Sequence, residues 1–132
     1  MSTEIRWVDR RALLYLHDES LREHGGLPGL RDEGLLDSAL ARPRHLLNYD
    51  EDVNLATLAA AYAVGIARNH PFLDGNKRTA FLALDLFCMI NGWKVVAAQA
   101  DVVTTMLRLA ANDLTEVELV VWIEAKIVPT GS

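Results

Sequence analysis

Residues 70–78, which read His-Pro-Phe-Leu-Asp-Gly-Asn-Lys-Arg, concentrate side chains capable of chemistry in one short run. The run holds an imidazole, a carboxylate, an amide, a glycine and two adjacent cations. An imidazole can act as a general base on a hydroxyl, a carboxylate oxygen can bind a divalent ion, and the cations can donate to anionic oxygens. Together these groups suit the transfer of a phosphate.

Each residue of this run also has a purely structural explanation. His70 alone could be a helix cap, Asp74 an N-cap, and Asn76 a turn residue. Lys77 and Arg78 alone could form a solvated helix face. Their joint occurrence favours an anion site, because cations at the start of a helix oppose its dipole unless an anion lies between them.

Length and composition predict one domain over residues 1–132 in a compact soluble protein, with 51% hydrophobic and 23% charged residues. The net charge of −5 disfavours direct nucleic-acid binding. Cys88 is the only cysteine, so an internal disulfide is excluded, and its apolar neighbours indicate an inert core thiol. Neither a signal-peptide profile nor an apolar stretch of membrane-spanning length is evident, so we expect a cytoplasmic protein without a membrane partner.

Apolar residues recur at helical spacing along the chain, which predicts an all-α, single-domain helical bundle. The run over 53–68 is apolar on nearly all sides, and such a helix belongs in the middle of a bundle. We predict helices from a cap at Asp9 to Gly25, from a cap at Asp32 to just before Pro43, from about Asp52 to Asn69, from Asn76 to Asn91, over 101–111 and from Thr115 to Lys126, with at most a short extended segment at Trp93–Ala97.

Residues 70–78 join two of these predicted helices. His70 follows the end of the central helix, and Phe72 is expected to pin the connection to the core. Gly75 permits backbone conformations that direct successive N–H groups at a phosphate. Residues 76–78 open the next helix, whose free N–H groups and positive dipole end favour an anion.

The rest of the chain offers weaker signals. P-loop, nucleophile-elbow and His-Glu-x-x-His patterns are absent from the sequence. Only Asp74 is near His70 in the sequence, so a metal held by protein groups alone is not expected. Magnesium shared between one carboxylate and nucleotide phosphates fits this supply of ligands better. Arg68, shortly before His70, is a candidate contact for a protein partner, although a solvated helix-end arginine is the commoner case.

Residues 70–78 resemble the signature of the Fic superfamily, and most closely that of its Doc (death-on-curing) branch. The stretch 25–32, Gly-Gly-Leu-Pro-Gly-Leu-Arg-Asp, is similar to the N-terminal part of Doc proteins, as are residues 34–36 and Ala39 after it. The resemblance covers most of the chain. It implies a small all-helical fold with the signature between its central helices.

Lys77 separates the branches of this superfamily. Typical Fic enzymes, which transfer a nucleotidyl group, have Gly-Asn-Gly-Arg where this chain has Lys77 in place of the second glycine. The resemblance to Doc implies a kinase that transfers the γ-phosphate of ATP, with Mg2+, to a threonine hydroxyl of elongation factor Tu and thereby stops translation. It implies His70 and Asp74 as catalytic residues, Asp74 as the magnesium ligand, and residues Gly75, Asn76, Lys77 and Arg78 as phosphate ligands.

The same resemblance implies regulation and partners. Doc proteins are toxins of type II toxin–antitoxin pairs, so a cognate antitoxin is expected as a partner, and Arg68 could contact it or the target. The inhibitory helix motif of many Fic enzymes is absent from the sequence, which leaves inhibition to a separate chain. Two other functions remain open: a Fic-type nucleotidyl (AMP) transferase, and a catalytically inactive binding module that keeps the fold.

Overall fold

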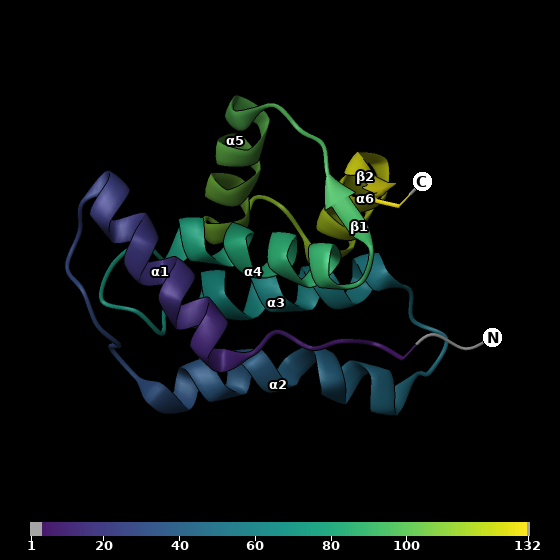
Figure 1. Ribbon diagram of the computed structural model, residues 1–132, viewed down its shortest axis with the longest axis horizontal. Helices are drawn as coiled ribbons and strands as arrows, with labels where there is room; N and C mark the ends of the chain where they lie inside the picture. The colour runs from purple at the N-terminus through teal and green to yellow at the C-terminus, as the bar shows by residue number, and fades with distance from the viewer. Residues whose placement is uncertain (1–3, 132) are drawn as a thin grey trace.

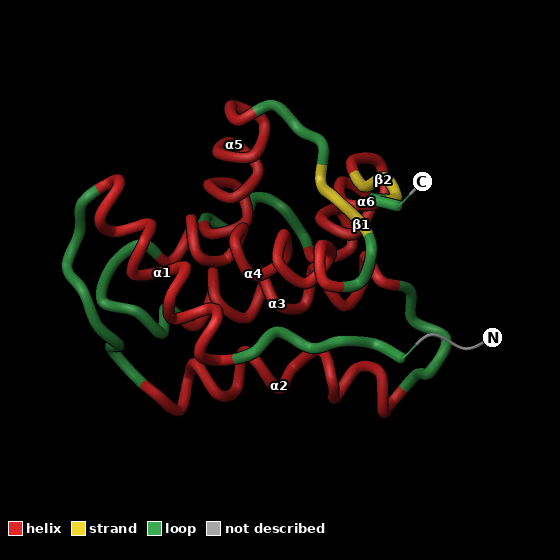
Figure 2. Tube along the Cα trace, viewed as in Figure 1, coloured by secondary structure: helices red, strands yellow, loops and turns green. Residues whose placement is uncertain are grey.

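The computed structural model describes residues 4–131, which form six helices and one two-stranded antiparallel sheet (Figures 1 and 2). The elements in chain order are α1 (Arg10–His24), α2 (Glu33–Tyr49), α3 (Leu55–Asn69), α4 (Asn76–Ile90), β1 (Trp93–Val95), α5 (Gln99–Ala110), α6 (Glu116–Lys126) and β2 (Ile127–Pro129). The predicted all-α class is confirmed. The extended segment predicted near Trp93 is β1, which pairs with β2, a strand that the sequence did not indicate.

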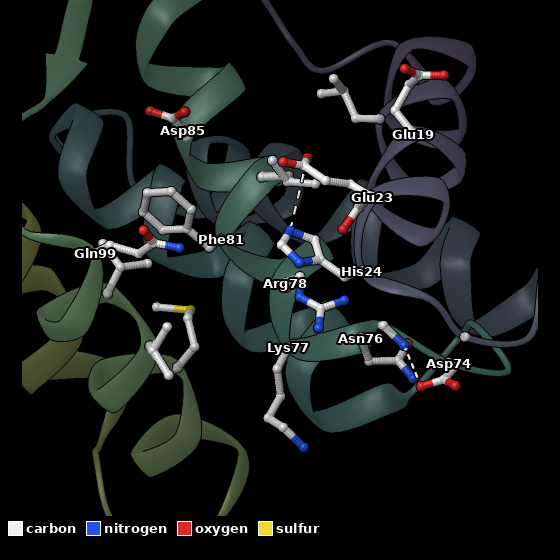
Figure 3. Close-up of a pocket in the computed structure, with 18 of the residues that line it drawn as sticks. Glu19, Glu23, His24, Asp74, Asn76, Lys77, Arg78, Phe81, Asp85 and Gln99 are labelled. Atoms are coloured by element: carbon white, nitrogen blue, oxygen red, sulfur yellow. Dashed lines mark hydrogen bonds and ion pairs between the residues drawn. The ribbon is translucent and has the colours of Figure 1, made fainter.

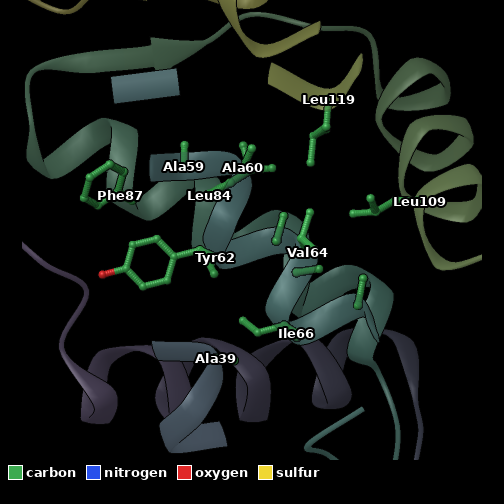
Figure 4. Close-up of a cluster of buried hydrophobic side chains, with 14 of the residues drawn as sticks. Ala39, Ala59, Ala60, Tyr62, Val64, Ile66, Leu84, Phe87, Leu109 and Leu119 are labelled. Carbon is green, nitrogen blue, oxygen red and sulfur yellow. The ribbon is translucent and has the colours of Figure 1, made fainter. Parts of the chain in front are cut away.

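α3 is the central helix of the bundle, as its composition predicted. It packs against α2, α4, α5 and α6, and its residues from Leu58 to Ala67 are all buried (Figure 4). Small residues allow this close packing: a Cβ added at Gly65 would lie 3.0 Å from both Cα and Cβ of Ala39 on α2. The buried central helix therefore ends directly before His70, the first residue of the run 70–78.

The predicted capping residues are mostly confirmed. Asp9 accepts from the N–H of Arg11, and Asp32 caps α2. Thr115 and Glu118 form a reciprocal capping box at the start of α6. The prediction that α3 begins near Asp52 is wrong by about two residues, because the side chain of Asn54 accepts from Thr57 and caps the helix instead.

α2 continues through Pro43 to Tyr49, so the prediction that it ends before Pro43 is wrong. A proline inside a helix removes one hydrogen bond and costs about 3 kcal/mol or more. Here Pro43 is buried, and Leu46 beyond it packs against the core. The preceding Arg42 makes a two-bond ion pair with Glu116 of α6, at 2.6 and 2.7 Å, and this pair holds the middle of α2 against the bundle.

The segment before α1 lies across the bundle in an extended conformation (Figure 1). The N–H of Val8 donates to the hydroxyl of Tyr62 on α3 at 3.1 Å.

Cys88 is buried in the core, as predicted, and burial raises the pKa of its thiol to about 12. None of the helices in the described part of the chain has the length and apolarity needed to cross a membrane.

Candidate active site

The signature loop, residues 70–75, connects the end of α3 to the start of α4. His70 caps α3 in a left-handed conformation, with φ 51° and ψ 57°, and its N–H donates to the carbonyl of Ile66 at 3.2 Å. Few residues other than glycine adopt a positive φ, so surrounding contacts must hold this backbone. Contacts from the connection between α1 and α2, from α1 and from α4 hold it.

Arg31, in the connection between α1 and α2, binds three consecutive carbonyl groups around His70. Its Nε donates to the His70 carbonyl and its Nη2 to the Asn69 carbonyl, both at 2.7 Å. The N–H groups of Arg31 and Asp32 donate to the Pro71 carbonyl at 2.7 and 3.1 Å. The turn at the end of α3 is thus fixed by a segment about forty residues earlier in the chain.

His17, on α1, supports the middle of the signature loop. It is buried, and its ring stacks on Phe72 with the centroids 3.8 Å apart and the planes at 16°. Its Nε2, carrying the proton, donates to the carbonyl of Asp74 at 2.8 Å. The expectation that Phe72 pins the loop to the core is confirmed, and the ring that it packs against is His17.

Asn76, the first residue of α4, uses its side-chain amide inside the loop. Its Oδ1 accepts from the N–H of Phe72, and its Nδ2 donates to the carbonyl of Phe72, both at 3.0 Å. Both halves of the amide therefore hold the loop. The prediction that Asn76 binds phosphate stays a prediction, and its main-chain N–H, at the first turn of α4, is the group best placed for that role.

Asp74 presents an exposed carboxylate at the edge of the loop. Its Oδ1 accepts from the N–H of Gly75 at 2.9 Å, and its Oδ2 accepts from the N–H of Leu27 at 3.3 Å. Each oxygen keeps a further lone pair for a metal ion. Within residues 4–131, no three His, Cys, Asp or Glu side chains are grouped so that they could hold a metal ion together. The prediction that Asp74 binds magnesium stays a prediction.

The start of α4 has the features of an anion site. Gly75 precedes it at φ 76°, and within the described chain no side chain caps the first turn and no acidic residue lies in it. Lys77 and Arg78 are exposed and form no ion pair with any described residue. Free N–H groups, the positive end of the helix dipole and two cations therefore meet at one place.

The signature loop borders a groove of about 1540 Å³ between α1, α4 and α5 (Figure 3). The apolar part of this groove is lined by Leu16, Phe81, Leu82, Val102, Val103 and Met106. The predicted site residues that line it are His70, Asp74, Gly75, Asn76, Lys77 and Arg78. Arg68 is exposed in the last turn of α3 and does not line this groove.

Acidic side chains line the groove away from the cations. Glu19 and Glu23 belong to α1, and Asp85 lies two turns beyond Arg78 on α4 (Figure 3). Burial raises the pKa of Asp85, which is half-buried. The groove therefore carries a cationic end at the start of α4 and acidic groups elsewhere along its walls.

Reasoning from the sequence missed Arg31 and His17. An imidazole at position 17 shares one helical face with Leu13 and Leu21, and a polar ring on an apolar face was a signal that could have been followed. Arg31 lies inside the glycine-rich stretch 25–32, but nothing local distinguishes it from a solvated arginine. Both residues act on main-chain carbonyls, which carry no sequence signature.

Comparison with known proteins identifies the family of this chain. Residues 7–88 match the Fic/DOC family. The chain is 37% identical over 91 residues to "Protein kinase doc" of Escherichia phage P1, covering 69% of this chain and 72% of that protein. It is 46% identical over 74 residues to "Toxin Doc" of Mycolicibacterium smegmatis, covering 55% of this chain and 57% of that protein. The chain belongs to the Fic/DOC family, and within it to the Doc branch.

Proposed function

We propose that this protein is a Doc-type toxin that acts as a protein kinase. It would transfer the γ-phosphate of ATP to a serine or threonine hydroxyl of a translation factor similar to elongation factor Tu, and so arrest translation. The names of the two relatives, one a protein kinase and one a toxin, support this proposal. The observation that carries it is the uncapped first turn of α4, with Lys77 and Arg78 beside it on the wall of the groove.

In this proposal, residues of the signature loop and of the start of α4 have separate roles in phosphoryl transfer. His70 takes the proton from the attacking hydroxyl. Lys77, Arg78 and the N–H groups at the start of α4 hold the phosphate oxygens, and Asp74 holds magnesium. The magnesium–nucleotide complex supplies the phosphoryl group when bound. Catalysis of this transfer depends mainly on positioning and charge neutralisation, and the held loop and paired cations provide both.

Lys77 favours γ-phosphate transfer over nucleotidyl transfer. In nucleotidyl-transferring Fic enzymes a glycine stands at this position and leaves room for the phosphates. Lys77 adds a long side chain there and also a cation beside the donor phosphate. The kinase reaction therefore gains a ligand where the nucleotidyl reaction loses space.

The test compares α- and γ-labelled ATP with a purified translation factor. We expect label from γ-labelled ATP alone, and loss of that label with Lys77→Gly, because the variant loses a cation near the donor phosphate. Lys94→Gly, which removes an exposed lysine on β1 outside the groove, is the matched control. Label from α-labelled ATP with the wild-type protein would show a nucleotidyl transferase, and absence of both labels would favour a binding module.

A cognate antitoxin is the proposed regulator, and the cytoplasm, where translation occurs, is the proposed location. Arg68 remains a candidate contact for the antitoxin or the target, since it is exposed next to the signature loop and outside the groove. Co-expression with the neighbouring gene product and recovery of growth would test the antitoxin. Unchanged binding by Arg68→Ala would remove that residue from both interfaces.

A further inference from the structure

Arg31 contacts the two carbonyl groups that flank the backbone of His70. Its Nε and Nη2 bind the carbonyls of His70 and Asn69, each at 2.7 Å. We infer that Arg31 is a positioning residue, whose guanidinium holds His70 in the left-handed conformation that places it on the groove wall. This inference rests on the proposed function, in which His70 is the base.

The geometry explains how one side chain can fix this conformation. The carbonyls of Asn69 and His70 belong to the peptide planes before and after the His70 Cα, and φ and ψ of His70 rotate these planes relative to each other. A planar guanidinium bound to both carbonyls resists that rotation. Because the φ of His70 is 51°, a conformation rarely favoured outside glycine, this resistance matters here more than in an ordinary helix end.

Electrostatic attraction strengthens the contact of the Arg31 guanidinium with these two carbonyl groups. The last carbonyl groups of a helix have no partner within the helix and carry the negative end of its dipole. Arg31 places a cation against two of these groups at the end of α3. A hydrogen bond with an ionised donor is stronger than a neutral one, which suits a contact that must hold an uncommon backbone conformation.

A substitution at position 31 can remove the side-chain hydrogen bonds of Arg31 and leave its main-chain hydrogen bond in place. The N–H of Arg31 donates to the Pro71 carbonyl at 2.7 Å, and the Asp32 N–H donates to the same oxygen at 3.1 Å. Every residue except proline carries a main-chain N–H at position 31. Arg31 is itself exposed, so its replacement removes no core packing. Arg31→Met keeps much of the aliphatic stem and removes every donor, and Arg31→Lys restores one cation without the two-donor geometry.

The experiment measures kcat and the KM for ATP in γ-phosphate transfer for wild type, Arg31→Met and Arg31→Lys. We expect Arg31→Met to lower kcat by about 10²-fold with KM unchanged, the effect of a small misplacement of a catalytic group. Arg31→Lys should recover part of the loss. Arg10→Gln is the control, because Arg10 is another arginine with two contacts, to Glu33 and Asp37, both away from the loop.

A second measurement does not depend on activity. The three-bond coupling between the amide and α protons of His70, measured by NMR, reports its φ and should change in Arg31→Met but not in Arg10→Gln. An unchanged coupling, an unchanged kcat, or a change confined to KM would overturn the inference. If wild-type protein transfers no γ-phosphate, the proposed function fails, and the coupling alone then decides whether Arg31 sets the conformation of His70.

Discussion

The Nε2 of His17 donates to the main-chain carbonyl of Asp74 at 2.8 Å, while the same ring lies flat against Phe72. One buried side chain on α1 therefore orients the carbonyl of the proposed magnesium ligand and packs against the residue that anchors the loop. Gly75 lies close to this ring, since a Cβ there would be 3.6 Å from the His17 Nε2. The loop and α1 thus form one packed unit.

Two substitutions separate the donor from the ring of His17. His17→Phe keeps an aromatic ring against Phe72 but leaves the Asp74 carbonyl without its donor, which should cost about 1–3 kcal/mol of unfolding free energy. We expect γ-phosphate transfer to fall as well. His17→Gln keeps a donor and should retain more activity than His17→Phe. Urea unfolding and transfer assays on both variants measure this, and wild-type values for His17→Phe would contradict it.

Local patterns predicted the parts of the fold that depend on neighbouring residues. The caps at Asp9 and Asp32, the capping box at Thr115 and the central position of α3 all follow from sequence spacing and composition. The signature run predicted a loop between two helices, and the structure places its polar residues along one groove. Reactive side chains that lie within nine consecutive residues can be recognised from the sequence without tertiary information.

Contacts between distant segments could not be predicted in this way. Arg31 and His70 are 39 positions apart, and His17 and Asp74 are 57 apart. In both pairs the acceptor is a main-chain carbonyl, so the identity of the accepting residue carries no information. The prediction that α2 ends before Pro43 was wrong for a related reason. The local penalty for proline follows from the sequence, but the burial of Pro43 and the Arg42–Glu116 ion pair that holds α2 against α6 are tertiary features.

Gly65 should be intolerant of a methyl group, because α2 and α3 approach closely there. In Gly65→Ala the new Cβ would lie 3.0 Å from Cα and Cβ of Ala39. Relief of this contact requires a shift of the α2 backbone, which is energetically unfavourable. Overpacking of this kind costs about 1–3 kcal/mol, more than the helix propensity that alanine gains. Thermal unfolding should show a lower Tm for Gly65→Ala. The control is Gly34→Ala at an exposed position in the first turn of α2, where the nearest atom to the new Cβ is a side-chain oxygen of Asp32 at 3.3 Å. A comparable loss of Tm in both variants would refute the packing argument.

Asp85 should make the stability of the protein depend on pH. Burial raises the pKa of this carboxyl in the folded state, so the folded protein holds the proton more tightly than the unfolded chain and loses stability as the pH rises through that pKa. Asp85→Asn removes this loss. Its unfolding free energy should exceed that of wild type at pH 7, and the difference should shrink as the pH falls toward the ordinary carboxyl value of 3.8.

Urea unfolding at several pH values measures the difference between Asp85→Asn and wild type. Asp52→Asn, at an exposed position between α2 and α3, controls for the general effect of removing one negative charge. A gain that is constant with pH would assign the effect of Asp85→Asn to packing rather than to ionisation.

The proposed base is best tested with His70→Asn. His70 has a positive φ, and asparagine adopts that conformation more readily than most residues, so this variant should keep the loop in place where alanine would add strain. Asparagine cannot accept the proton of the attacking hydroxyl, and general-base catalysis contributes about 10²–10⁴-fold in rate. We therefore expect γ-phosphate transfer to fall by that factor, while ATP binding, measured by calorimetry, stays unchanged.

The control is His45→Asn, because His45 is an exposed histidine on α2, and this variant should transfer phosphate at the wild-type rate. Full turnover by His70→Asn would exclude His70 as the base, and loss of ATP binding would instead place it among the nucleotide ligands.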